Sequence, residues 1–156
     1  DKYSWVDKGS SYVLSDLLAA LLYSQLSHSN HIQSKRELMW NTYFKNLEGW
    51  ASGHGITLPF VPAHCEQTYH MFYLMMPDQL SRDELIASLG KKNISTAFHY
   101  VPLHSSKMGL EIALKDQDNC PISSNVSNRI VRLPLFYNLE NADQAKVIDA
   151  VTALIL

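Results

Sequence analysis

The sequence predicts an α+β fold in which one long helix is followed by a small, mainly antiparallel sheet with helices on one face. Three observations lead to this class. Apolar residues recur at helical spacing through the first third of the chain, short β-type runs follow a cluster of glycines, and capped amphipathic segments separate those runs. The predicted order is a long helix, then β, β, α, β, α, β and α. We therefore expect two parts, residues 1–50 and residues 51–156.

A long helix accounts for the first part. Ser15 is suited to cap its N-terminus. Leucines then recur three and four positions apart from Leu17 to Leu26, and the apolar pattern continues to Leu47. We place a bend near residues 29–31 and the end of the helix at a cluster of three glycines. Because alanines fill the positions between the leucines, the helix should contact protein on a second face.

Short strands and shorter helices make up the second part. The β-type runs cover residues 56–60, 70–76, 95–101 and 133–136. The second run is apolar throughout, as in a strand covered on both faces. We expect four helices in this part. The first has Ser81 as the N-cap of a capping box, and the second is a short helical segment near Met108. The third is capped by Ser123 or Ser124, and the last is capped by Asn141.

The composition is typical of a globular domain. The chain has 156 residues, 46% of them apolar and 18% charged, with a formal net charge of −2. This balance gives no electrostatic footprint for nucleic acid, and no apolar run approaches the ~20 residues that cross a bilayer. Two cysteines without metal-like pairing favour a reducing compartment, so we expect a cytoplasmic protein. The start at Asp1, without an initiator methionine, suggests a fragment or a processed product.

The stretch Phe98–Ser105 concentrates polar groups at a strand end. The residues before it have β-type composition, and Pro102 stops the ladder because it has no N–H to donate. His99 and Tyr100 precede the proline, and we expect His104, which follows it, to leave the ladder and point into a cleft. Imidazole and phenol groups can both donate hydrogen bonds. A surface strand end with ordinary polar residues would explain the same pattern.

Four segments carry a resemblance to a known family. They are Gly9–Leu26, His70–Tyr73, Phe98–Ser105 and Arg132–Asn138. In their order and spacing they resemble the C-terminal part of sugar-nucleotide aminotransferases of the DegT/DnrJ/StrS group, and the resemblance covers essentially the whole chain. It implies the small C-terminal domain of a fold-type-I enzyme that uses pyridoxal phosphate. The large N-terminal domain of such an enzyme would lie outside this chain.

The resemblance implies transamination of a nucleotide sugar. Glutamate would give its amino group to pyridoxal phosphate, and the amino group would pass to C4 of a dTDP-4-keto-6-deoxy sugar. The product would be a dTDP-4-amino-4,6-dideoxy sugar, such as the galactose form used for enterobacterial common antigen and other surface polysaccharides. Amination at C3 of a related nucleotide sugar is the alternative.

The family's cofactor lysine lies in a Ser-Phe-His-x-x-Lys-Asn-type motif that falls before Asp1. Schiff-base chemistry needs that amine, so we expect no catalytic residue in this chain and no activity from the chain alone. Family members form homodimers or larger homo-oligomers, which implies the large domain and a second subunit as partners, with neither nucleic acid nor membrane.

The resemblance also implies two groups of site residues. Gly9, Ser10 and Ser11 would reach the cofactor phosphate of the neighbouring subunit through backbone N–H groups and hydroxyls. Relatives often carry Asn or Arg within this segment, so the side-chain contact is left open here. The substrate-binding residues would be His99, Tyr100 and His104, at the entrance for the nucleotide sugar.

Two other classes of function are open from the residues alone. A metal-binding module would use His64, Cys65, His70, His99 and His104. Closed structural zinc sites favour paired ligands at short spacing, which these residues lack, and we assign no metal ligand. A non-catalytic interaction domain would use the long helix as its docking surface.

Overall fold

The computed structural model describes residues 4, 6–9, 13–112 and 120–154. Its elements are α1 (Asp16–Leu26), α2 (Ser29–Gly53), β1 (Phe72–Met75), α3 (Gln79–Lys91), the 3-10 helix η1 (Leu103–Ser105), α4 (Lys107–Ile112), α5 (Pro121–Arg129), β2 (Ile130–Leu133) and α6 (Asn141–Thr152). The α+β class and the antiparallel pairing are confirmed. The sheet is smaller than the sequence predicted.

The sheet consists of β1 and β2, paired antiparallel with Phe72 opposite Leu133 and Met75 opposite Ile130. Two of the predicted strands are reduced to single bridges. Residues 56–60 contribute only Thr57, which bridges to β1, and residues 95–101 contribute only Ala97, which bridges to β2. The single bridges therefore lie on opposite edges of the strand pair.

Local chemistry explains why the predicted strands were wrong in length or place. Pro59 has no N–H, so the run at 56–60 cannot continue a ladder. The run at 95–101 leaves the sheet because the carbonyl oxygen of Tyr100 accepts a hydrogen bond of 3.1 Å from the Ser127 hydroxyl of α5. The run predicted at 133–136 is found at 130–133, since Pro134 ends the strand one residue after Leu133.

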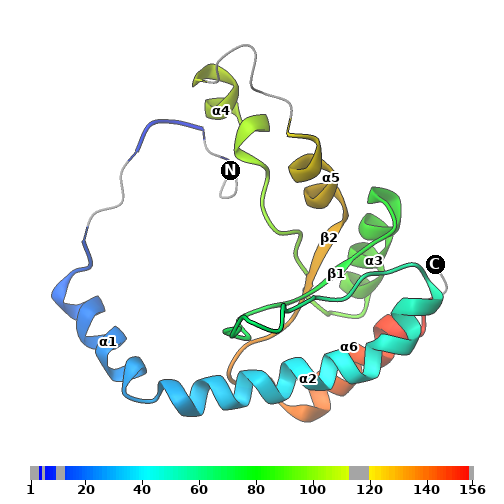
Figure 1. The fold of residues 1–156 in the computed structure, drawn as a ribbon, viewed down its shortest axis with the longest axis horizontal. Helices are drawn as coiled ribbons and strands as arrows, with labels where there is room; N and C mark the ends of the chain where they lie inside the picture. Colours follow the sequence, from blue (N-terminus) through cyan, green and yellow to red (C-terminus); the bar gives the residue numbers. More distant parts are fainter. Residues whose placement is uncertain (1–3, 5, 10–12, 113–119, 155–156) are drawn as a thin grey trace.

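The predicted long helix is divided into α1 and α2 at Ser27 and His28. The Ser27 hydroxyl donates to the carbonyl oxygen of Tyr23 at 3.0 Å, and Nδ1 of His28 lies 3.0 Å from the carbonyl oxygen of Ser24. Side chains that bond to the preceding turn compete with the helical ladder and bend it. The bend therefore lies just before the predicted position. α1 projects away from the rest of the molecule (Figure 1), and none of its residues is buried.

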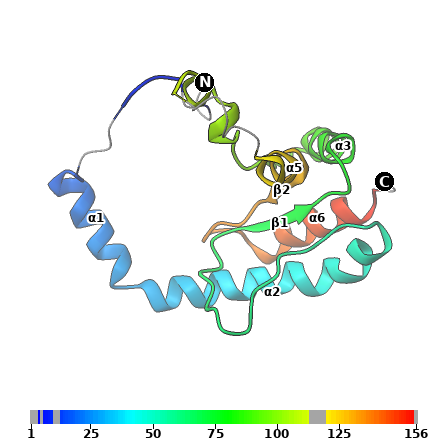
Figure 2. The same cartoon turned by 45° about the horizontal axis from the view of Figure 1, so that its top comes forward.

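The core lies between the sheet and the two helices α2 and α6, which run side by side (Figures 1 and 2). The fully buried side chains include Tyr43, Leu47, Phe72, Leu74, Leu85, Leu89, Val131 and Val151. Each buried side chain of this size contributes roughly 1.5–3 kcal/mol relative to its exposed state. Polar contacts also tie α2 to the rest. Among them, the Tyr43 hydroxyl donates to the Pro134 carbonyl, and Gln144 Nε2 of α6 donates to the Met39 carbonyl at 2.6 Å.

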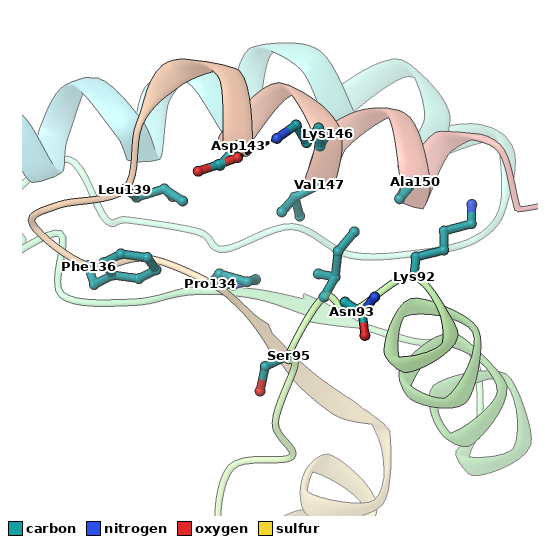
Figure 3. A pocket seen from close by; sticks show the side chains of 11 residues that line it. Lys92, Asn93, Ser95, Pro134, Phe136, Leu139, Asp143, Lys146, Val147 and Ala150 are labelled. Carbon is teal, nitrogen blue, oxygen red and sulfur yellow. Dashed lines mark hydrogen bonds and ion pairs between the residues drawn. The ribbon is translucent and has the colours of Figure 1, made fainter.

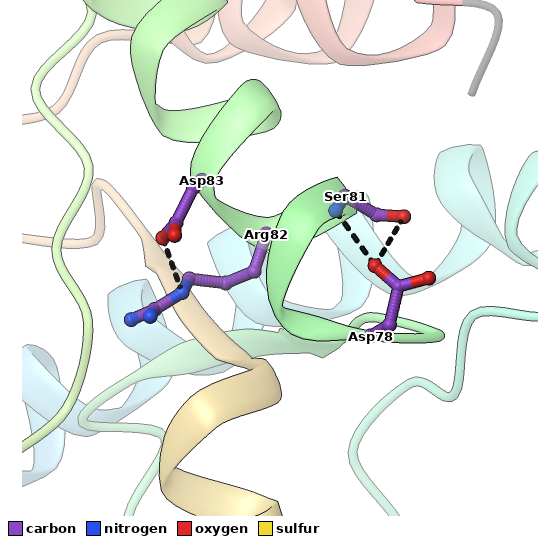
Figure 4. A network of polar contacts seen from close by, with 4 residues as sticks. All are labelled: Asp78, Ser81, Arg82 and Asp83. Carbon is purple, nitrogen blue, oxygen red and sulfur yellow. Dashed lines mark hydrogen bonds and ion pairs between the residues drawn. The ribbon is translucent and has the colours of Figure 1, made fainter.

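The helix α3 is capped by Asp78, and not by Ser81 as the sequence predicted. One carboxylate oxygen of Asp78 accepts from the backbone N–H of Ser81 at 2.8 Å and from its hydroxyl at 2.9 Å (Figure 4). These bonds hold the pKa of Asp78 below its usual value. The carboxylate begins the helix because it reaches two donors at once, whereas the serine occupies the third helical position.

The predicted starts of two later helices are also shifted. α5 begins at Pro121, before both candidate serines, because proline suits the first helical position. α6 begins at Asn141, with Glu140 as the residue before the helix. The short helix predicted from Met108 is found as α4.

Candidate functional site

The outer face of the sheet carries the polar residues that the core excludes. Phe72 and Leu74 are buried, as are Val131 and Leu133 on the neighbouring strand. Because side chains alternate along a strand, Tyr73 and Arg132, which are opposite each other in the register, belong to the other face. Both are partly buried. This face is where the predicted site residues must be sought.

The segment after Ala97 lies against Arg132. Ala97 and Arg132 exchange backbone hydrogen bonds of 3.3 and 2.7 Å. The guanidinium carbon of Arg132 lies 5.9 Å from the centre of the Tyr100 ring, and the His99 and Tyr100 rings meet edge to face with centres 4.9 Å apart. The structure therefore brings two predicted substrate-binding residues, His99 and Tyr100, together with an arginine.

The electrostatics of His99 follow from this position. Its pKa is lowered from the usual value, first by burial and then by the positive charges of Arg132 and His70. Its Nδ1 atom is buried and has no hydrogen-bond partner among the described residues. His99 therefore favours its neutral form, with one ring nitrogen still to be satisfied.

His104 is separated from this group. It belongs to η1, so it has left the ladder after Pro102 as predicted. Its Nε2 atom lies 2.9 Å from the Ser124 hydroxyl on α5, and its side chain is partly buried. The contact directs His104 toward α5, whereas the sequence led us to expect a side chain directed into a cleft. Its role in substrate binding stays a prediction.

The predicted cofactor-binding segment can be described only at one position. Gly9 is exposed, and no described atom lies within 4 Å of where a Cβ would stand. Ser10 and Ser11 lie outside the described residues. The open space around Gly9 leaves room for an anion to approach its backbone, so the residue fits the phosphate of pyridoxal phosphate. The contact itself stays a prediction.

A small pocket of about 220 Å³ lies beside Arg132. Its lining includes His70, Thr96 and Arg132, together with apolar side chains of the strand ends. A larger cavity of about 820 Å³ lies between α6 and the chain after β2 (Figure 3). Its walls are mainly apolar, and Lys146 at its edge pairs with Asp143 at 2.6 Å. The larger cavity contains none of the predicted site residues.

The described residues contain no group of three or more His, Cys, Asp or Glu side chains that could hold a metal ion. His64, Cys65, His70, His99 and His104 all belong to the described part, and the structure does not bring three of them together. Within the same part, no helix combines the length and the apolar composition needed to cross a membrane.

Two residues of the small pocket were not assigned to the site from the sequence. The sequence allowed Arg132 to meet an anionic group, with a surface ion pair as the default, and Thr96 was treated only as part of a strand. The available signal was one arginine within the otherwise apolar run Ile130–Leu135. A charge at such a position needs a partner, but the sequence does not say which segment lies beside it.

Comparison with known proteins identifies the family. The model of the DegT/DnrJ/EryC1/StrS aminotransferase family matches residues 1–152. The dTDP-3-amino-3,4,6-trideoxy-alpha-D-glucose transaminase of Streptomyces venezuelae is 30% identical over 151 residues, which are 96% of this chain and 38% of that protein.

Solved structures agree with this assignment. DesV of S. venezuelae, in complex with a ketimine intermediate, superposes with a TM-score of 0.80 at 28% identity, over 99% of this chain and 41% of that one. The aminotransferase TlmJ of Streptoalloteichus hindustanus gives a TM-score of 0.76 at 25% identity, over 90% of this chain and 36% of that one. The chain spans about two fifths of the length of the curated relatives it matches, 38% and 40% for two of them. It belongs to the DegT/DnrJ/EryC1/StrS aminotransferase family, whose members are pyridoxal-phosphate-dependent sugar aminotransferases.

Proposed function

We propose that this chain is the substrate-binding C-terminal part of an aminotransferase that moves the amino group of glutamate to C4 of a dTDP-4-keto-6-deoxy sugar. The product is a dTDP-4-amino-4,6-dideoxy sugar for surface polysaccharide synthesis. The observation that carries the proposal is the cluster of His99, Tyr100 and Arg132 on the outer face of the sheet. Family membership over residues 1–152 supports the reaction class.

Each residue has a proposed role toward the sugar nucleotide. Tyr100 is 53% exposed, so its phenol can meet a hydroxyl or a phosphate oxygen at the protein surface. His99 presents an imidazole beside it. His104, held by Ser124, would approach the same substrate from the side of α5. Together these groups orient the substrate and do not take part in proton transfer.

The cofactor and the second subunit complete the proposal. Pyridoxal phosphate supplies the chemistry that carries the amino group, and the lysine that binds it belongs to the large domain. The backbone around Gly9 would bind the cofactor phosphate of a neighbouring subunit. The exposed leucines of α1 would be covered by the large domain or by that subunit.

A second candidate is amination at C3. It is favoured by the relative from S. venezuelae, which is named as a dTDP-3-amino sugar transaminase and is 30% identical to this chain. The two candidates differ only in which ring carbon is aminated, so they predict the same residues and different products.

The deciding experiment uses the longer protein that contains this chain. It is given glutamate with a dTDP-4-keto-6-deoxy sugar or with the 3-keto isomer, and the aminated carbon is located by NMR. Amination at C4 is the expected result, amination only at C3 would select the second candidate, and absence of both products would contradict the proposal. His99→Gln should slow turnover, whereas His64→Gln, at an exposed histidine outside the cluster, should not.

A further inference from the structure

We propose that the pocket lined by His70, Thr96 and Arg132 binds an oxyanion, the carboxylate or phosphate group of a substrate. This inference rests on the proposed function and deepens it, because it assigns a position to the anionic end of a substrate. The pocket lies at the junction of β2 with the segment around Ala97, where these two segments are joined by a single β-bridge.

Three buried polar atoms near this junction have unsatisfied hydrogen-bonding capacity. Thr96 Oγ1, His99 Nδ1 and Arg132 Nε are buried, and none has a hydrogen-bond partner within the described part of the chain. A buried polar atom left unpaired is unfavourable, so most such groups in native proteins have a partner. Arginine and the threonine hydroxyl are donors, and neutral histidine can present one N–H. Thr96 and Arg132 also line the pocket, so a ligand there that only accepts hydrogen bonds would have two donor side chains beside it.

The guanidinium of Arg132 gives the pocket positive charge. The described residues that line it include Arg132 and His70 and no carboxylate. Among the described residues, the ion pairs are Arg82 with Asp83 and Lys146 with Asp143, and Arg132 takes part in neither. A guanidinium presents a planar set of donors that matches the two oxygens of a carboxylate or phosphate. An unpaired, partly buried arginine therefore selects an oxyanion over a neutral ligand.

The positive charge of the pocket affects the pKa of the neighbouring residue His99. His99 has a lowered pKa, to which Arg132 and His70 both contribute after burial. An anion in the pocket, beside Arg132 and His70, would oppose that contribution, because a nearby negative charge favours the protonated imidazole. The charge state of His99 therefore reports on the occupancy of the pocket.

The size of the pocket limits which part of a ligand it can hold. The pocket has a volume of about 220 Å³, and sites that enclose a whole drug-sized ligand usually measure roughly 300–1,000 Å³. It therefore takes one anionic group and leaves the remainder of the ligand outside. In the proposed reaction two substrates carry such a group: the amino donor has carboxylates, and the nucleotide sugar has a diphosphate.

Binding is tested on the full 156-residue chain by NMR of the side-chain nitrogens. Glutarate and inorganic pyrophosphate are added separately at constant ionic strength. The Arg132 Nε–H signal should shift and saturate with at least one of them, and the pKa of His99 should rise when that anion is bound. The variants are compared at the His99 ring nitrogens, which all of them retain. Arg132→Gln should abolish saturation, Thr96→Val should weaken binding, and Arg132→Lys should weaken it less than Arg132→Gln does.

A control variant distinguishes anion binding in the pocket from general electrostatic attraction to the protein surface. Arg36→Gln removes the same charge from α2 and should leave the anion affinity unchanged. Equal losses in Arg36→Gln and Arg132→Gln, or shifts that never saturate, would overturn the proposal. Thermal unfolding of each variant shows whether it is folded, and Thr96→Val retains the arginine if Arg132→Gln does not fold.

The source of the anion is decided in the longer protein by single-turnover measurements. Arg132→Gln should slow one half-reaction about 10- to 150-fold, as expected for a lost hydrogen bond to a charged group. Slowing of the glutamate half-reaction identifies a carboxylate, and slowing of the nucleotide-sugar half-reaction identifies the diphosphate. Equal losses in both, or no loss, would overturn the assignment. If the longer protein does not transaminate, the proposed function fails, while anion binding by this chain still tests the pocket.

Discussion

The hydroxyl of Tyr43 donates a hydrogen bond of 2.8 Å to the carbonyl oxygen of Pro134, which joins the middle of α2 to the residue that ends β2. Tyr43 is fully buried, and burial raises the pKa of its phenol far above the usual value. The phenol therefore stays protonated and acts as a donor throughout the physiological range. It connects two segments that are 91 residues apart.

Tyr43→Phe should lower the free energy of unfolding by about 1–3 kcal/mol, because it removes the donor and leaves a buried carbonyl unpaired. Urea denaturation followed by circular dichroism measures the change. Tyr23→Phe, at a residue of α1 that is 75% exposed, should change stability by less than about 0.5 kcal/mol. A loss no larger than that of the control would mean that the bond is not maintained in solution.

Gly109 should not tolerate a side chain. A Cβ at this position would overlap the backbone carbonyl of Leu103, which cannot move without disturbing η1. The Ser106 hydroxyl also donates to the Leu103 carbonyl at 2.7 Å and accepts from the Gly109 N–H at 3.0 Å. Gly109→Ala should therefore destabilise the chain by about 1–3 kcal/mol, as overpacking does.

The matched control for Gly109 is Gly90. It lies in α3, and apart from its chain neighbours and the backbone of its own helix no described atom lies within 4 Å of where a Cβ would stand. Gly90→Ala should therefore stabilise by about 0.5–1 kcal/mol. Thermal unfolding compares the two variants, and amide hydrogen exchange should show faster opening of residues 103–110 only in Gly109→Ala. Similar effects from both substitutions would contradict the proposed overlap.

His99 should make the stability of the chain dependent on pH. Its folded-state pKa is lowered, so the folded state binds its proton less readily than the unfolded state does. Its stabilising contribution is complete above the unfolded pKa of about 6.5 and is lost as the pH falls through the folded value. Burial is the main cause of the lowered pKa, and the nearby groups Arg132 and His70 add to it.

Urea denaturation at pH 7.5 and pH 5 measures this contribution. His99→Gln should reduce the fall in stability between the two pH values, whereas His64→Gln should reduce it less. Arg132→Gln should raise the pKa of His99, as observed by NMR. A pH dependence unchanged in His99→Gln would show that other groups produce it.

The exposed leucines of α1 should make the isolated chain self-associate. Leu17 is 81% exposed, and Leu21 and Leu26 are each more than half exposed. A patch of this kind usually marks a protein contact. Light scattering should show a mass that rises with concentration, and Leu17→Glu with Leu21→Glu should reduce it. Leu38→Glu, at an exposed leucine of α2, should have a smaller effect, and a strictly monomeric parent chain would contradict the prediction.

His104→Ala should weaken the nucleotide-sugar half-reaction in the longer protein and leave the glutamate half-reaction unchanged. The expected loss is about 10- to 150-fold, for one hydrogen bond to a charged group. Ser124→Ala removes the hydroxyl that holds the imidazole at 2.9 Å, so it should cause a smaller loss in the same half-reaction. Single turnovers measure both, and equal losses in the two half-reactions would assign His104 to the fold or to the cofactor.

Local sequence patterns determined where most helices lie. Leucine spacing predicts α1 and the continuation into α2, and the polar group around Asp78 and Ser81 predicts the start of α3 within three residues. These features depend on neighbours within one or two helical turns, so they can be predicted from the sequence. The same holds for His99, Tyr100 and His104, which stand out because polar groups cluster at a strand end.

The tertiary structure decided which of the β-type runs pair and which polar groups meet. Residues 95–101 have strand composition, yet only Ala97 pairs, because Ser127 of α5 binds the Tyr100 carbonyl. His104 was directed to Ser124 by the same helix. Arg132 acquires its significance only when β2 is placed beside Ala97, 35 residues earlier in the chain. Contacts between distant residues depend on how buried surfaces fit together in three dimensions, and no spacing along the chain encodes that fit.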